Sequence, residues 1–269
     1  MLKVVQHIGL LALLVSSSFP ANANTNRDAL LNTLMEKSGI NATLTHFPQN
    51  LKSIAARQKP SKCTPPHSQH FAMAVDGAFD AKTLTHNMRS KLHDTMSVGD
   101  MQQILAWLNT PLGAKITALE NEASSPQALL ATQEQFAALS LDSARVAQLE
   151  QLIDATNMVA YSTSLAEKMQ VSVVKAIMHN SLQQTSLQEL QLNIEKNHSS
   201  LRGIIQRELQ MSGLYTYQSL SNTELQQYID FIKSPIGQKY HTTTTIALNY
   251  ITTKAGERFG QLLMMPVPS

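Results

Sequence analysis

Apolar residues recur every three or four positions along most of this chain, which is the spacing of one buried face of an α-helix. Helices are predicted over residues 26–38, 40–57, 69–95, 98–109, 111–122, 126–139, 144–156, 158–180, 187–217, 222–233 and 235–262. We expect a kink or break in the second of these near Pro48, because proline cannot donate the helical hydrogen bond. No stretch of the sequence alternates apolar and polar residues as a half-buried strand does, so the pattern predicts an all-α fold.

One segment of this pattern occurs twice. Residues 97–116 read SVGDMQQILAWLNTPLGAKI and residues 221–240 read SNTELQQYIDFIKSPIGQKY, an ungapped match at an offset of 124 residues. The paired residues that are identical are Ser97/Ser221, Gln102/Gln226, Gln103/Gln227, Pro111/Pro235, Gly113/Gly237 and Lys115/Lys239. The duplication predicts two tandem, pseudo-repeated helical bundles, over 24–140 and 141–269, joined by the short helix over 126–139.

Each copy carries the signals of a sharp turn between two helices, which we call the elbow. A serine three residues before an acidic residue is a capping box at the start of the first helix, as in Ser97–Asp100 and Ser221–Glu224. A hydroxyl residue followed by proline then begins the second helix, as in Thr110–Pro111 and Ser234–Pro235. Gly113 and Gly237 remove a side chain where two backbones approach each other. Every part of the elbow therefore has a packing explanation.

The elbow resembles an exported bacterial family known only as domain of unknown function 2059. In both, an apolar helix with an aromatic residue leads into Ser or Thr, Pro, Leu or Ile, Gly, any residue and Lys. Residues 107–113 and 231–237 carry the resemblance. It implies an all-α fold and an exported protein, and it brings no reaction and no catalytic residues with it.

The N-terminus predicts export. Lys3 precedes an apolar run over residues 8–15, and Ala21-Asn22-Ala23 is a cleavage sequence for signal peptidase. We therefore interpret residues 1–23 as a signal peptide and expect a periplasmic protein. No later run reaches the ~20 apolar residues of a membrane-spanning helix, so no integral membrane segment is expected after cleavage.

Charge and composition exclude some partners. The net charge is only +2, and hydrophobic residues make up 43% of the chain, enough for a real core. There is no cluster of Lys and Arg in the sequence, so a nucleic-acid partner is not expected.

The best chemical candidate lies outside the elbows. Cys63, His67 and His70 follow one another closely, and cysteine and histidine are ligands of copper and zinc. Their spacing matches no established zinc signature, and a complete site would need a further ligand. A solvated loop that contains histidines explains the same residues. Cys63 is the only cysteine, so no internal disulfide can form.

Sequence motifs of catalysis are absent, including the nucleophile elbow G-x-S-x-G, H-E-x-x-H and C-x-x-C. We therefore expect a non-enzymatic helical binding or scaffolding protein without a cofactor, which would bind an envelope protein or peptide in an apolar groove between the two halves. The alternative is a periplasmic copper or zinc binder that uses Cys63, His67 and His70. A hydrolase with a dispersed site is a third hypothesis, which no motif supports.

Overall fold

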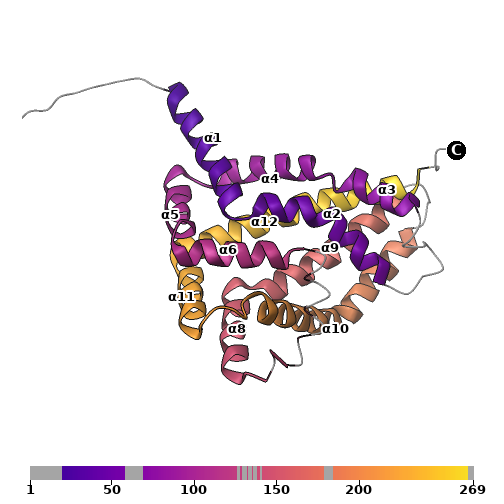
Figure 1. The fold of residues 1–269 in the computed structure, drawn as a ribbon. Helices are drawn as coiled ribbons and strands as arrows, with labels where there is room; N and C mark the ends of the chain where they lie inside the picture. Colours follow the sequence, from indigo (N-terminus) through magenta and orange to yellow (C-terminus); the bar gives the residue numbers. More distant parts are fainter. Residues whose placement is uncertain are drawn as a thin grey trace, which may run out of the picture.

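The structure is a computed structural model that describes residues 20–57, 69–125, 141–178 and 184–265, with scattered positions between 126 and 140. Within these residues every regular element is an α-helix, which confirms the all-α prediction (Figure 1). The helices are α1 (Pro20–Lys37), α2 (Ile40–Arg57), α3 (Gln69–Ala78), α4 (Ala81–Thr95), α5 (Val98–Leu108), α6 (Pro111–Ala123), α8 (Ser143–Thr156), α9 (Met158–Met178), α10 (Gln184–Thr216), α11 (Asn222–Lys233) and α12 (Pro235–Leu263).

The helix predicted to kink or break near Pro48 is not broken there and continues through it as α2. Another prediction about helix continuity is wrong. The single helix predicted over 69–95 is two helices, because Asp80 caps a new one: its carboxylate accepts the backbone N–H of Thr83 at 2.8 Å. The apolar spacing runs on across this break through the buried Phe79, so periodicity alone could not reveal it. The linking helix predicted over 126–139 lies mostly outside the described residues.

The two elbows, at α5–α6 and α11–α12, have the same hydrogen bonds. At the start of α5 and of α11 both capping boxes are complete, formed by Ser97 with Asp100 and by Ser221 with Glu224. At the turn itself, the Thr110 hydroxyl accepts the N–H of Gly113 at 3.0 Å, and the Ser234 hydroxyl accepts the N–H of Gly237 at 3.1 Å. The caps expected from the sequence therefore direct the chain in the same way at both places.

The elbow glycines lie against backbone. A Cβ atom on Gly113 would lie 2.3 Å from the carbonyl oxygen of Trp107, and one on Gly237 would lie 2.0 Å from that of Phe231. Both separations are far below van der Waals contact, so only glycine fits at these positions.

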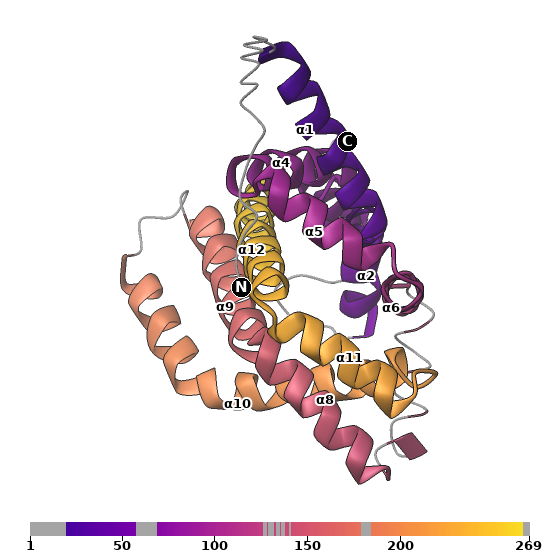
Figure 2. The same ribbon diagram turned by 90° about the vertical axis from the view of Figure 1, so that its left-hand side faces the viewer.

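The second helix of each elbow crosses to the hydrophobic core of the other half. α12 contributes Ala247, Ile251 and Ala255 to the core that α1 to α5 form. α6 contributes Ile116 to the core that α8 to α11 form. Figures 1 and 2 show the result: α12 runs through the middle of the molecule, between α9 and the helices of the first half.

Reciprocal contacts join the two elbows. The rings of Trp107 and Phe231 stack with their centroids 4.3 Å apart and their planes 6° from parallel. The amine of Lys115 lies 2.7 Å from the carboxylate of Glu224, and the amine of Lys239 lies 2.7 Å from that of Asp100. Each lysine thus binds the capping-box acid of the opposite elbow, which is the pattern of a two-fold symmetric interface.

These ion pairs make a testable contribution to the pH dependence of stability. The hydrogen bond from Lys239 lowers the pKa of Asp100 to about 2, and the hydrogen bond from Lys115 lowers that of Glu224 to about 2. A carboxyl whose pKa is lowered by folding stabilises the fold above its unfolded pKa and loses that contribution as the pH falls through the folded value.

In the double variant Lys115→Met/Lys239→Met we therefore expect a small loss of unfolding free energy that is complete above about pH 5 and shrinks toward about pH 2. Urea unfolding across this range measures it. Lys233→Met is the control, because the Lys233 amine donates to the neutral amide of Gln151, and its effect should not follow the same pH curve.

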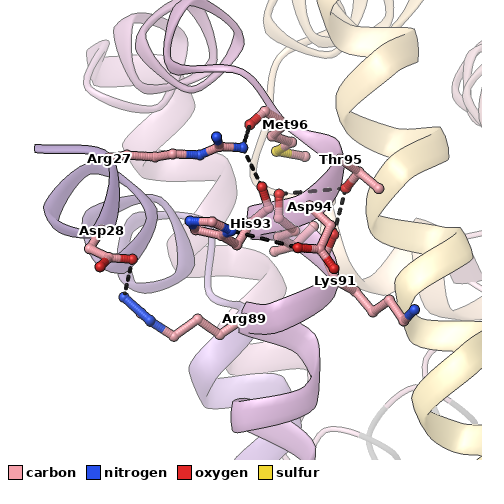
Figure 3. Close-up of polar contacts among 9 residues, drawn as sticks. Arg27, Asp28, Arg89, Lys91, His93, Asp94, Thr95 and Met96 are labelled. Atoms are coloured by element: carbon pink, nitrogen blue, oxygen red, sulfur yellow. Dashed lines mark hydrogen bonds and ion pairs between the residues drawn. The ribbon is translucent and has the colours of Figure 1, made fainter. Parts of the chain in front are cut away.

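A polar contact fixes α1 on α4 (Figure 3). The Arg27 guanidinium donates to the carbonyl oxygens of His93 and Met96 at the end of α4, the latter at 2.9 Å. Nearby, Arg89 of α4 pairs with Asp28 of α1 at 2.9 Å. These contacts satisfy carbonyls that have no partner within the helix, so this charged cluster is structural.

Candidate functional site

A cavity of about 360 Å³ lies among α2, α6, α9 and α12, near the meeting point of the two cores. Its wall is mainly apolar, and includes Ile40, Leu44, Met158, Leu165 and Leu248. A second cavity of about 520 Å³ adjoins it toward α8, α10 and α11, and the two share the lining residues Thr43, Glu120, Met158, Tyr240, His241 and Thr244. Apolar cavities of roughly 300–1,000 Å³ with a few polar groups are typical binding sites for small molecules.

Glu120 of α6 is the acidic group of this cavity. Its Oε1 accepts the hydroxyl of Tyr217 at 2.7 Å and that of Tyr228 at 2.9 Å. Burial raises the pKa of the Glu120 carboxyl, and the two hydroxyl donors oppose that shift. Burial likewise raises the pKa values of both tyrosines well above the ordinary value, so both hydroxyls stay protonated and keep donating.

α12 supplies the other polar groups. Nε2 of His241 lies 2.8 Å from the carbonyl oxygen of Thr156, which can only accept, so Nε2 carries the proton. Burial lowers the pKa of His241, and a neutral ring with Nε2–H leaves Nδ1 as an acceptor. Oγ1 of Thr244 is buried and has no hydrogen-bond partner among the described residues. Burial also raises the pKa of Tyr240 to about 12.

These polar groups lie where the duplicated segments stop resembling each other. At the offset of 124 residues, Tyr240 corresponds to Ile116, His241 to Thr117, and Thr244 to Glu120. The match of the elbows ends at residues 115 and 239, just before these positions. No motif in the sequence pointed to Glu120 or to His241. The one sequence signal that could have located these residues is the position at which the two copies stop resembling each other.

The structure describes only one of the three candidate metal ligands, so it does not test whether they form a site. Cys63 and His67 lie outside the described residues, and His70 lies in α3, where its Nε2 is 3.1 Å from the carbonyl oxygen of Leu263. In the part of the chain that the structure describes, no group of three or more His, Cys, Asp or Glu side chains could hold a metal ion. The copper- or zinc-binding alternative therefore stays a prediction.

The polar groups that form the elbows already have partners within the protein. The capping hydroxyls, the capping-box acids and both elbow lysines are all engaged in the contacts described above. We therefore place the candidate site in the cavity and assign the elbows to the fold.

Comparison with known proteins agrees with the resemblance of the elbow. Residues 83–141 match the model of a family described as an uncharacterized protein conserved in bacteria, domain of unknown function 2059. The matched region contains the first elbow and Glu120, so over these residues the chain is similar to the family that the elbow resembles. No curated protein and no solved structure matches the chain. Among the described residues, no helix has both the length and the apolar character needed to cross a membrane.

Proposed function

We propose that this chain, which matches domain of unknown function 2059 over residues 83–141, is a non-enzymatic binding protein of the periplasm that takes up a small, mainly apolar ligand. The observation that carries the proposal is the cavity among α2, α6, α9 and α12, with its apolar wall and its few polar groups. Its location between the two halves is where the sequence led us to expect a groove. The periplasmic part of the proposal depends on the signal peptide predicted over residues 1–23.

The protein holds two polar groups of the cavity in fixed orientations. Oε1 of Glu120 accepts two tyrosine hydroxyls, and Nε2 of His241 donates to a backbone carbonyl. Groups that are fixed in this way are suited to orient a bound molecule. The volume of the cavity suits a small molecule or the end of an apolar chain, which differs from the envelope protein or peptide expected from the sequence.

Binding can be measured with a neutral fluorescent dye, N-phenylnaphthylamine, which gains fluorescence in apolar surroundings. We expect saturable binding to the full-length chain and displacement by long-chain alcohols. Ser162→Phe should weaken dye binding about tenfold or more, because Ser162 lines the cavity and the larger ring would occupy it. Ser164→Phe is the matched control: Ser164 is on the same helix but lines a different groove that is more open to solvent, and this variant should bind as the unaltered protein does.

Equal loss of binding in both variants, or dye binding that Ser162→Phe leaves unchanged, would contradict the proposal. Thermal unfolding of both variants checks that the comparison is made between folded proteins.

A further inference from the structure

We propose that the cavity selects ligands with a protonated amine at the end of an apolar chain, and that Glu120 is the residue that binds the amine. This inference deepens the proposed function, because it assumes that the cavity binds a ligand and names the chemistry of that ligand.

The charge of the lining favours a cationic ligand. Among the described residues that line the two adjoining cavities, Glu120 is the only one with a formal charge at neutral pH, and neither Lys nor Arg is present. A carboxylate or phosphate ligand would lose its water without gaining a positive partner, and it would be repelled by Glu120. A cationic ligand would instead offset the cost of keeping the Glu120 carboxylate away from water.

The geometry of the Glu120 carboxyl leaves one of its oxygens for a ligand. Tyr217 and Tyr228 both donate to the same oxygen, Oε1. Two donors stabilise the ionised form and hold the group in one orientation, which leaves the lone pairs of Oε2 for another donor. An ammonium group has three N–H donors and no acceptor, so it can bind Oε2 and still donate to other groups.

The remaining polar groups of the cavity include further hydrogen-bond acceptors. The Nδ1 atom of His241 is an acceptor, and Oγ1 of Thr244 is buried with no partner among the described residues. The cavity therefore offers acceptors that are suited to the remaining N–H groups of an amine. The apolar residues of the wall, named above, suit the hydrocarbon part of the ligand.

The test compares three ten-carbon ligands on the full-length chain: decylamine, decanol and decanoate. Calorimetry and dye displacement, below the concentrations at which these compounds form micelles, give their dissociation constants. We expect decylamine to bind about thirty-fold more tightly than decanol, and decanoate to bind least. Glu120→Gln should remove most of the preference for the amine and change decanol binding by less than about threefold, because glutamine keeps the shape and loses the charge.

The dependence on pH gives a second readout that needs no variant. The titratable groups that line the cavities around Glu120 are Tyr217 from α10, Tyr228 from α11, Tyr161 from α9, and Tyr240 and His241 from α12. Protonation of Glu120 and protonation of His241 would each weaken cation binding, so the preference for decylamine over decanol should fall as the pH is lowered.

The outcomes separate this inference from the proposed function. Equal binding of decylamine and decanol, or tighter binding of decanoate, overturns the amine selectivity while the cavity remains a binding site. A preference for the amine that persists in Glu120→Gln and at low pH overturns the role of Glu120. Failure of all three ligands to bind overturns the proposed function and this inference together.

Discussion

Gly237→Ala should lower the free energy of unfolding by about 3 kcal/mol, although alanine is the better residue for a helix. The new Cβ atom would lie 2.0 Å from the carbonyl oxygen of Phe231. That oxygen cannot withdraw easily, because it accepts the hydroxyl of Ser234 at 2.6 Å and the N–H of Ser234 at 3.0 Å. To relieve this overlap, the turn between α11 and α12 would have to widen, and the stacked rings of Trp107 and Phe231 would move apart.

Urea unfolding measures this loss, and a glycine elsewhere in the chain supplies the control. Gly203 is within α10, and a Cβ atom there would have nothing within 4 Å. Gly203→Ala should therefore stabilise the protein by up to about 1 kcal/mol through helix propensity alone. Effects of the same sign in the two variants would refute the tight backbone contact at the elbow.

Arg145→Met should cost about 3 kcal/mol or more, the second of the two largest effects we expect. The Arg145 side chain is buried, and it donates to the carbonyl oxygens of Tyr217 and Leu220 and to the side chain of Asn222 at 3.1 Å. It thus connects α8 to the segment between α10 and α11. Methionine keeps most of the apolar volume and leaves these acceptors without a donor inside the protein.

A surface arginine provides the comparison for this loss. Arg89 pairs with Asp28 at 2.9 Å, and both side chains are substantially exposed, at 32% and 49%. Arg89→Met should cost less than about 1 kcal/mol, as exposed ion pairs do. Thermal and urea unfolding of the two variants measure the difference in unfolding free energy. Similar losses in both variants would show that the burial of Arg145 adds nothing to the stabilisation that its contacts provide.

Most of the helical framework could be predicted because its causes are local. Apolar spacing and caps located the helices from α8 to α12 to within a few residues, and the elbow signals at Ser97, Thr110, Ser221 and Ser234 act as expected. The break before Asp80 escaped prediction because the apolar spacing continues across it. The packing of α6 and α12, each against the core of the opposite half, was also not predicted. The sequence of an amphipathic helix shows which face is buried, but not which core that face joins.

The candidate site could not be predicted for a related reason. Glu120 and His241 are 121 residues apart in the chain, and only the packing of α6 and α12 brings them to one cavity. Sequence reasoning looked for polar residues that are close in sequence, and so it chose Cys63, His67 and His70. Glu120 gives no local signal, because a glutamate in a helix is ordinarily a solvent-exposed residue.

The reciprocal contacts between the elbows have a consequence for how such a cavity can evolve. Two identical chains that associated through the same elbow would be related by exact two-fold symmetry. Each substitution would then appear twice in a cavity formed between them. An acid at the Glu120 position would then have a second carboxylate at the related position, and two buried negative charges would repel each other. Joining both copies in a single chain removes that constraint. The position related to Glu120 is Thr244 in this protein, so one copy supplies the charge and the other a neutral hydroxyl.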